Sequence, residues 1–277
     1  MTINCSGTIL DLKTPKVMGI VNLTPDSFYD GGNLKNERDI LKHVELLLKE
    51  GADIIDIGGC STRPGSTIIT KEEELKRVEK PIISIIKNFS NIKISIDTFR
   101  SEVAKMALNE GAVMINDISG GILDNNMFSL LEKFKIPYVL NHMKVFPKIM
   151  QKYISYNQNI IIEINHFFSK KIHYLKKHGI NDIILDPGFG FGKTLKQNLT
   201  LLKYLQLLGF QDYLILIGVS RKSMIKKILN ISYEESLNGT SIIHTISILK
   251  GIKFFRVHDV KEAIECIKLI EYYKFLD

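Results

Sequence analysis

The chain has 277 residues, of which 45% are hydrophobic, and no apolar run reaches the roughly 18 residues that a membrane-spanning helix needs. The net charge of +7 comes from lysines scattered over the expected helices, which favours a solvated basic surface and argues against a nucleic-acid partner. Three widely spaced cysteines and a start without the form of a signal peptide favour a reducing cytoplasm. No stretch resembles a linker, so we expect residues 1–277 to form a single domain.

Short apolar segments alternate with longer amphipathic segments along the whole chain. Strands are expected over 17–23, 54–58, 93–97, 113–117, 137–141, 183–186, 214–218 and around 253–258. Helices are expected over about 37–50, 72–87, 101–109, 155–178, 196–208 and 237–250, with a short helix before the last of these and a further helix at the end of the chain. Glycines at 51, 111 and 179 follow three of these helices and are expected to end them.

Each expected strand ends in small or polar residues. These ends are Asn22, Gly58-Gly59, Asp97-Thr98, Asn116-Asp117, Asn141-His142, Asp186-Pro187-Gly188, Ser220-Arg221-Lys222 and Arg256-Val257-His258. Eight strands that alternate with helices must run parallel, which predicts an α/β protein with a (β/α)8 TIM barrel. Because active sites of such barrels lie at the carboxyl ends of the strands, we expect an enzyme whose site residues are among these ends.

Asp97, Asn116 and Asp186 end strands that are otherwise apolar. A buried carboxylate is costly unless donors surround it, so this set would suit a polar heterocycle with an amidine-like edge. The alternative for each aspartate is a helix cap or a salt bridge to a nearby lysine.

Arg63, Lys222, Arg256 and His258 form a cationic group on the loops and the last two strand ends. Such residues bind phosphate oxygens, and barrels often bind phosphate after their last two strands. The alternative for Arg256 is a surface side chain, although Arg256 and His258 should point the same way along a strand. A metal held by Asn22 and substrate phosphates would suit Mg²⁺, which needs few protein ligands.

Three further features carry weaker signals. The glycine–aromatic run from Asp186 to Lys193 permits close backbone approach to a ligand, but it is no known phosphate-binding motif. Cys60 has no evident partner base and is expected to be an unreactive thiol. His142 is either a ligand contact or a hydrogen-bonded group behind the site.

The motifs and their order resemble the dihydropteroate synthases, pterin-binding enzymes of the folate pathway, over nearly the whole chain. The resemblance rests on the segments 18–28 (MGIVNLTPDSF), 58–65 (GGCSTRPG), 186–193 (DPGFGFGK), 220–223 (SRKS) and 256–259 (RVHD).

The resemblance implies an enzyme that joins 4-aminobenzoate to 6-hydroxymethyl-7,8-dihydropterin diphosphate and releases pyrophosphate, with Mg²⁺ near Asn22. It implies a homodimer formed through the last helices. It also implies that the pterin ring is read by Asp97, Asn116, Asp186, Lys222 and Arg256. The diphosphate is then held by Asn22, Arg63, Arg256 and His258, and the aminobenzoate lies near Thr62, Pro64, Phe191 and Ser220.

Two residues depart from the family pattern. Cys60 stands where many members carry glutamate, and Asn141 stands where methionine is common before His-Met. Neither is assigned to catalysis, so activity is expected to survive. Two other functions remain open: a methyltransferase that uses methyltetrahydrofolate, which would need no grip on a diphosphate, and a pterin-binding paralogue without turnover.

Overall fold

The computed structural model describes residues 2–24, 36–61, 66–144, 156, 159–210 and 212–276. Eight short strands form the centre of the molecule: β3 (Lys16–Asn22), β4 (Ile54–Gly58), β5 (Ile94–Asp97), β6 (Met114–Asp117), β7 (Tyr138–Asn141), β8 (Ile183–Asp186), β9 (Leu214–Ile217) and β10 (Phe254–Val257). They pair in parallel and close into a barrel in the order β10-β3-β4-β5-β6-β7-β8-β9. The predicted (β/α)8 barrel is therefore confirmed.

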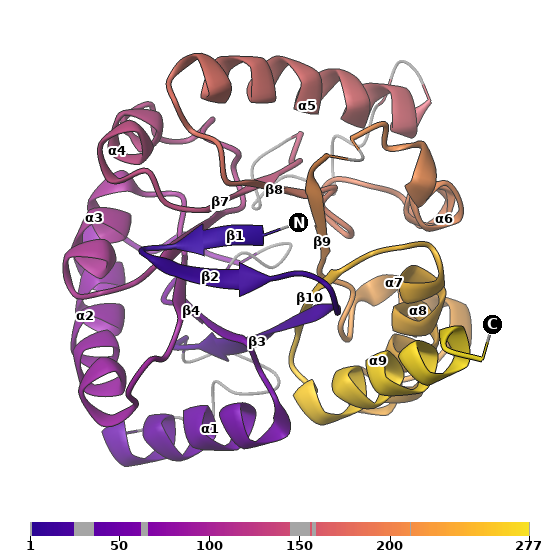
Figure 1. Ribbon diagram of the computed structural model, residues 1–277, viewed down its shortest axis with the longest axis horizontal. Coiled ribbons are helices and arrows are strands. Elements are labelled where there is room, and N and C mark those ends of the chain that lie inside the picture. Colours follow the sequence, from indigo (N-terminus) through magenta and orange to yellow (C-terminus); the bar gives the residue numbers. More distant parts are fainter. Residues whose placement is uncertain are drawn as a thin grey trace.

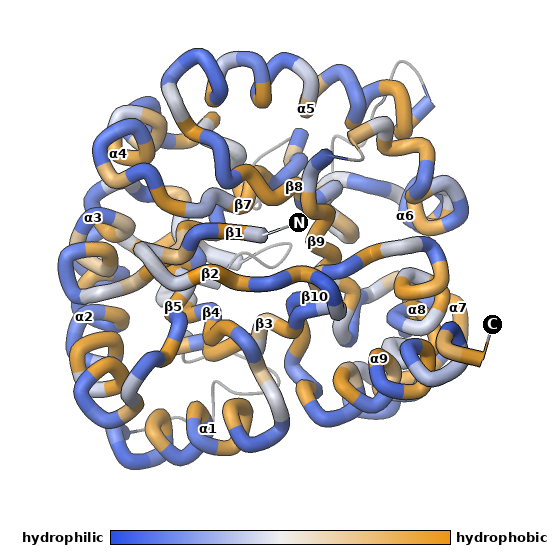
Figure 2. Tube along the Cα trace, in the orientation of Figure 1, coloured by the Kyte–Doolittle hydropathy of each residue, from blue (hydrophilic) through white to orange (hydrophobic). Residues whose placement is uncertain are grey.

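Helices surround the barrel on all sides (Figure 1). They are α1 (Glu37–Glu50), α2 (Lys71–Asn88), α3 (Ser101–Asn109), α4 (Asn126–Phe134), α5 (Ile160–Lys177), α6 (Leu195–Lys203), α7 (Ser223–Leu229), α8 (Leu237–Leu249) and α9 (Val260–Lys274), with 3-10 turns η1 (Leu205–Leu207) and η2 (Glu234–Ser236). Apolar and polar residues alternate along most of them (Figure 2), as expected for helices with one face on a sheet. Within the described ranges, no helix is both long and apolar enough to cross a bilayer.

Side chains along each strand point alternately into and out of the barrel, which creates two separate cores. On β4, Ile55 and Ile57 point outward and pack with helix residues in the larger core. Ile54 points inward and joins a smaller core inside the barrel, which also contains Met18, Met114, Val139, Ile184 and Phe254. The inward positions nearer the carboxyl ends of the strands are polar, and they supply the site.

A two-stranded hairpin, β1 (Thr2–Cys5) and β2 (Thr8–Asp11), lies across the amino-terminal end of the barrel (Figure 1). Its buried residues Ile3, Cys5 and Leu10, with Leu12, complete the inner core. The hairpin, which was not predicted from the sequence, therefore closes the end of the barrel away from the predicted site.

Element bounds differ from the prediction at a few points. The helix expected over 155–178 begins only at Ile160, because the Asn159 side chain accepts the Ile161 N–H and caps the helix there. The helix expected over 196–208 ends at Lys203 and continues as η1. Helix α4 was not predicted. By contrast, α1 has the predicted bounds, since Asn36 caps its start and Gly51, at φ +106°, ends it.

Candidate functional site

A cavity of about 550 Å³ lies at the carboxyl ends of the barrel strands. Strand register brings the ends together, because Asn22 pairs with Gly58, Gly58 with Asp97, and Asp97 with Asn116. The cavity walls contain these predicted site residues: Asn22, Asp97, Asn116, Asp186, Phe191, Ser220, Lys222, Arg256 and His258.

Thr62 and Arg63, the other predicted site residues, lie outside the described residues, as does Pro64. The two residues before them, Cys60 and Ser61, line the cavity.

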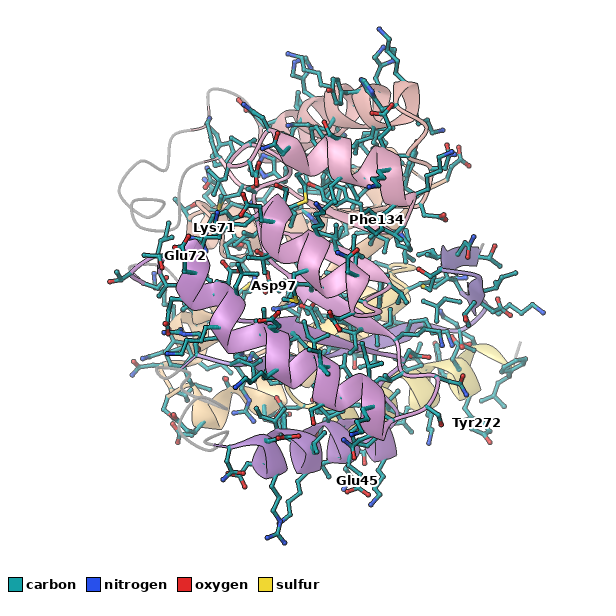
Figure 3. The ribbon with its side chains drawn as sticks, turned by 90° about the vertical axis from the view of Figure 1, so that its left-hand side faces the viewer. Glu45, Lys71, Glu72, Asp97, Phe134 and Tyr272 are labelled. Carbon is teal, nitrogen blue, oxygen red and sulfur yellow. The ribbon has the colours of Figure 1, made fainter. Side chains whose placement is uncertain are left out.

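Arg256 lines the cavity and lies between two carboxylates. Its Nε donates to Asp56 Oδ2 at 2.6 Å and its Nη2 donates to Asp97 Oδ2 at 2.7 Å. Asp56 also accepts from Asn116 Nδ2 at 3.0 Å, so one carboxylate orients two side chains that face the cavity. Asp97 lies inside the ring of helices (Figure 3).

The charged groups in this cluster shift one another's pKa values. Burial raises the pKa of Asp97 to about 7, against the lowering effect of the Arg256 guanidinium and with a further rise from Asp56. The pKa of Arg256 is raised, because the effect of Asp56 and Asp97 outweighs burial. Arg256 therefore stays charged, while the Asp97 carboxyl group loses its proton at higher pH than an exposed aspartate does.

Asp186 is the carboxylate on the other side of the cavity. Its Oδ1 accepts the Gly188 N–H at 2.7 Å and its Oδ2 accepts from Asn141 Nδ2 at 3.0 Å. Burial raises its pKa, and the Lys222 ammonium opposes that shift.

Lys222 carries the cation with the largest electrostatic effect on this carboxylate. Its Nζ donates to the Phe189 carbonyl and lies 4.3 Å from the centre of the Phe191 ring. Burial lowers the pKa of Lys222 to about 8, and Asp186 opposes the shift. An ammonium next to a carboxylate and an aromatic face suits a flat, polar ring.

Ser220 and His258 lie at another part of the cavity wall. The Ser220 Oγ lies 3.2 Å from both the backbone N and the Nδ1 of His258, which fixes the imidazole beside strand β10. Arg221, between Ser220 and Lys222, has a structural role, because it forms two hydrogen bonds with the Asp259 carboxylate, at 2.7 and 2.8 Å. It also donates to the carbonyls of Tyr233 and Glu234, which ties the loop after β9 to η2.

The glycine–aromatic loop after β8 is organised around the buried Lys193 ammonium. Its Nζ donates to the carbonyls of His142, Gly188 and Phe191, at 3.2, 2.8 and 3.2 Å. Three carbonyl acceptors use all three ammonium protons. The loop that places Phe189 and Phe191 on the cavity wall is therefore fastened to the loop after β7.

His142 and Cys60 remain without a direct chemical role in this geometry. His142 is buried, lies edge-on to the Phe167 ring at 5.0 Å, and has its pKa held well below the usual range by burial. Burial also raises the pKa of Cys60, which packs with Phe99, Ile118 and Met143. A raised thiol pKa supports the predicted unreactive role.

A magnesium site built from the protein alone is not evident. The described parts of the chain hold no group of three or more His, Cys, Asp or Glu side chains placed to bind a metal ion. Asn22 lines the cavity and presents one amide group. One oxygen ligand fits an ion that reaches the site bound to a diphosphate, since Mg²⁺ keeps most of its ligands from phosphate and water.

Three site residues were not predicted from the sequence: Asp56, Asn141 as a partner of Asp186, and Lys193 as a loop anchor. Asp56 had a usable signal, because a lone carboxylate within the apolar run Ile-Ile-Asp-Ile is as costly to bury as Asp97. The contacts of Lys193 depend on how a loop folds back, which spacing alone does not reveal.

Comparison with known proteins agrees with this geometry. The chain matches the family described as "Pterin binding enzyme" over residues 18–258. It is 40% identical to the dihydropteroate synthase of Escherichia coli K12 over 273 residues, which is 98% of this chain and 96% of that protein.

Solved structures show the same similarity. The Yersinia pestis dihydropteroate synthase in complex with a sulfonamide drug superposes with a TM-score of 0.94 and 38% identity, covering 100% of both chains. The Xanthomonas albilineans enzyme with 4-aminobenzoic acid superposes with a TM-score of 0.89 and 34% identity, covering 99% of this chain and 98% of that chain. The chain therefore belongs to the pterin-binding enzyme family, among the dihydropteroate synthases.

Proposed function

We propose that the chain joins 4-aminobenzoate to the CH₂ carbon of 6-hydroxymethyl-7,8-dihydropterin diphosphate, giving 7,8-dihydropteroate and pyrophosphate in tetrahydrofolate synthesis. The observation that best supports this function is that acidic and basic side chains line the same cavity. Carboxylates of Asp97 and Asp186 face it as acceptors, while Lys222, Arg256 and His258 face it as cations or hydrogen-bond donors. Acceptors suit the N–H groups of the pterin ring and donors suit phosphate oxygens.

Ring recognition would fall to Asp97, Asn116, Asp186 and Lys222. Asn116 donates its amide N–H to Asp56, so its amide oxygen is left for a ring donor. Asp97 would share its carboxylate between Arg256 and the ring. Two carboxylates beside the ring would stabilise the positive charge that develops when the diphosphate leaves.

The diphosphate would be held by Arg63, Arg256 and His258, with Asn22 as one ligand of Mg²⁺. Bound Mg²⁺ would neutralise charge on the phosphate oxygens. The C–O bond breaks with its electron pair on the pyrophosphate, the neutral aryl amine forms the C–N bond, and the amine then releases a proton to solvent. No strong protein base is required. The aminobenzoate would lie near Thr62, Phe191 and Ser220.

The decisive experiment measures pyrophosphate release by the purified protein with Mg²⁺ and the pterin diphosphate, with and without 4-aminobenzoate. Release that depends on 4-aminobenzoate and yields dihydropteroate supports the proposal. Pterin binding without release would indicate a non-catalytic pterin-binding paralogue, or a loop impaired by Cys60. The Cys60→Glu variant separates the two, since only an impaired loop would regain activity.

The roles of the cations can be tested in the same assay. We expect Lys222→Ala and Arg256→Ala to lower kcat/KM by about 100-fold or more, because each removes a charge next to the reacting ring or leaving group. Near-normal turnover of either variant would refute the assigned roles.

A homodimer is part of the proposal. Helices α7, α8 and α9 lie together beside the C-terminus (Figure 1), and exposed apolar residues gather on them. Helix α8 has no charged side chain, yet Ile242 and Leu249 are 52% and 53% exposed. Tyr272 projects outward from α9 (Figure 3). An apolar surface of this kind suits a second copy of the chain.

Free thiols at all three cysteines support a cytoplasmic location.

A further inference from the structure

Asn141 and Asp186 are the last residues of two neighbouring strands and lie side by side. β7 and β8 are parallel, and the register pairs Asn141 with Asp186. Both side chains line the cavity and both are almost fully buried, at 3% and 5% exposure. The Asn141 amide therefore meets the Asp186 carboxylate away from bulk water.

The contact gives the carboxylate a second fixed donor. Asn141 Nδ2 donates to Oδ2 at 3.0 Å, while the Gly188 N–H donates to Oδ1 at 2.7 Å. One donor on each oxygen fixes the plane of the carboxylate and leaves its remaining lone pairs for a ligand. Each donor also favours the ionised form, against the effect of burial.

The other end of the Asn141 amide is fixed by the turn after β8. An ionised carboxylate only accepts hydrogen bonds, so the amide must present its nitrogen to Asp186 and its oxygen away from it. That oxygen lies against Gly188, where a Cβ would approach it to 2.9 Å and would lie 2.1 Å from the His142 carbonyl oxygen. The Asn141 side chain is thus held between Asp186 and the Gly188 turn.

This arrangement is poor for stability. The Asn141 Oδ1 is buried and, among the described residues, has no hydrogen-bond partner. A buried acceptor without a donor is costly, and an apolar side chain of similar length would avoid that cost. The benefit of asparagine at this position therefore lies in the bond to Asp186 rather than in packing.

We propose that Asn141 is a positioning residue for ring recognition: it holds the Asp186 carboxylate ionised and turned toward the paired N–H donors of the pterin edge. The inference rests on the proposed function, because it assigns Asp186 to the ring. Asn141 would act through Asp186, and it would favour binding of a ring that carries an amino group beside a ring N–H.

The test uses Asn141→Met, which replaces the amide by an unbranched apolar side chain that cannot donate to Asp186. Leu140→Met is the matched control. Leu140 precedes Asn141 on β7 but faces the outer core, so the control reports any general effect on the strand. Calorimetry on the whole protein measures the Kd of 6-hydroxymethylpterin and of the lumazine analogue, in which oxygen replaces the 2-amino group.

We expect Asn141→Met to weaken pterin binding about 10-fold, as for loss of one hydrogen bond to a charged group, and lumazine binding by less than about 2-fold. The unfolding midpoint in urea should stay the same or rise. In turnover, KM for the pterin diphosphate should rise with kcat nearly unchanged. Equal weakening for both ligands, or a lower urea midpoint with unchanged Kd values, would overturn the inference.

A pH profile adds a readout that packing alone would not move. Among the described residues, the charged groups that act on Asp186 are Lys222, Lys193 and Arg256. These groups and Asp97 are the same in both proteins, so a shift of the acid limb of pterin binding to higher pH in Asn141→Met would report the loss of the Asn141 donor to Asp186. Pterin binding is measured directly and does not depend on turnover. A wild-type protein that binds pterin but forms no dihydropteroate would therefore refute the proposed function, and the role of Asn141 could still be tested by binding.

Discussion

Asp56 decides where two cavity side chains point, because it holds Arg256 at 2.6 Å and Asn116 at 3.0 Å. We expect Asp56→Asn to keep the fold but lower kcat/KM about 10- to 100-fold, since Arg256 loses a charged partner and the Asn116 amide loses its fixed orientation. Steady-state pyrophosphate release measures the effect.

The matched control for Asp56→Asn is Asp53→Asn. Asp53 lies just before β4 at the other end of the barrel, where it accepts the Val17 N–H at 2.9 Å and pairs with Lys16 at 3.2 Å. The control should leave kcat/KM within about 2-fold, because it is far from the cavity. Equal losses in both variants would mean that Asp56 acts only through stability.

Protonation of Asp97 and Lys222 should shape the pH dependence. Burial raises the pKa of Asp97 to about 7, so its ionised form, which can accept ring N–H groups, gains population as pH rises through 7. Burial lowers the pKa of Lys222 to about 8, so its charge is lost as pH rises past 8. We therefore expect kcat/KM to rise as Asp97 ionises and to fall as Lys222 loses its charge.

Lys222→Arg separates the two limbs of this profile. Arginine stays charged, so the alkaline limb should move to higher pH while the acid limb stays near 7. If kcat/KM of the variant still falls near pH 8, the alkaline limb is not caused by Lys222.

The strand-end residues of the cavity could be predicted from sequence for a simple reason. The last inward residue of a parallel strand must lie at the rim, so the positions of Asp97, Asp186 and Arg256 followed from strand order alone. Asp56 and Asn141 act on those residues through hydrogen bonds between neighbouring strands. Such pairs depend on register and side-chain orientation, which strand order alone does not specify.

At the scale of elements, the two ends of the barrel have different roles. The amino-terminal hairpin covers the inner core and lies away from the cavity. We expect Leu12→Ala, at a residue that is 0% exposed, to lower the free energy of unfolding by about 3 kcal/mol and to leave kcat/KM unchanged. Urea denaturation measures the first quantity and pyrophosphate release the second.

Ile9→Ala is the control within the same hairpin, because Ile9 is 68% exposed and has little apolar contact to lose. It should change the free energy of unfolding by less than about 0.5 kcal/mol. If Leu12→Ala instead raised KM, the hairpin would influence the site and the separation of roles would be wrong.

Helix prediction succeeded where capping and periodicity agreed. Asn36 and Gly51 bracket one apolar stripe, so α1 has the predicted bounds. The start of α5 was predicted too early, because apolar periodicity gives no sharp start and the cap at Asn159 had to be recognised. The hairpin was missed because two four-residue strands carry little periodic signal.

At the scale of the whole molecule, eight repeats of strand and helix made the architecture the most secure prediction. The oligomeric state is harder to predict from sequence, since an apolar stripe on an outer helix can cover either the barrel or another subunit. The structure shows which residues of α8 cover the barrel, because Ile243 is buried while Ile242 and Ile246 are 52% and 36% exposed.

We predict that Ile242→Glu combined with Leu249→Glu converts a dimer into a monomer in sedimentation velocity. The two residues lie on the exposed side of α8, at 52% and 53% exposure, and a buried carboxylate without a partner would prevent close packing of two copies. Ile83→Glu on α2, at 43% exposure, is the control and should leave the assembly unchanged. Neither Ile242 nor Leu249 lines the cavity, so the monomer should retain kcat/KM within about 3-fold if it stays folded. A wild-type protein that sediments as a monomer at micromolar concentration would refute the dimer and leave the exposed face of α8 to another partner.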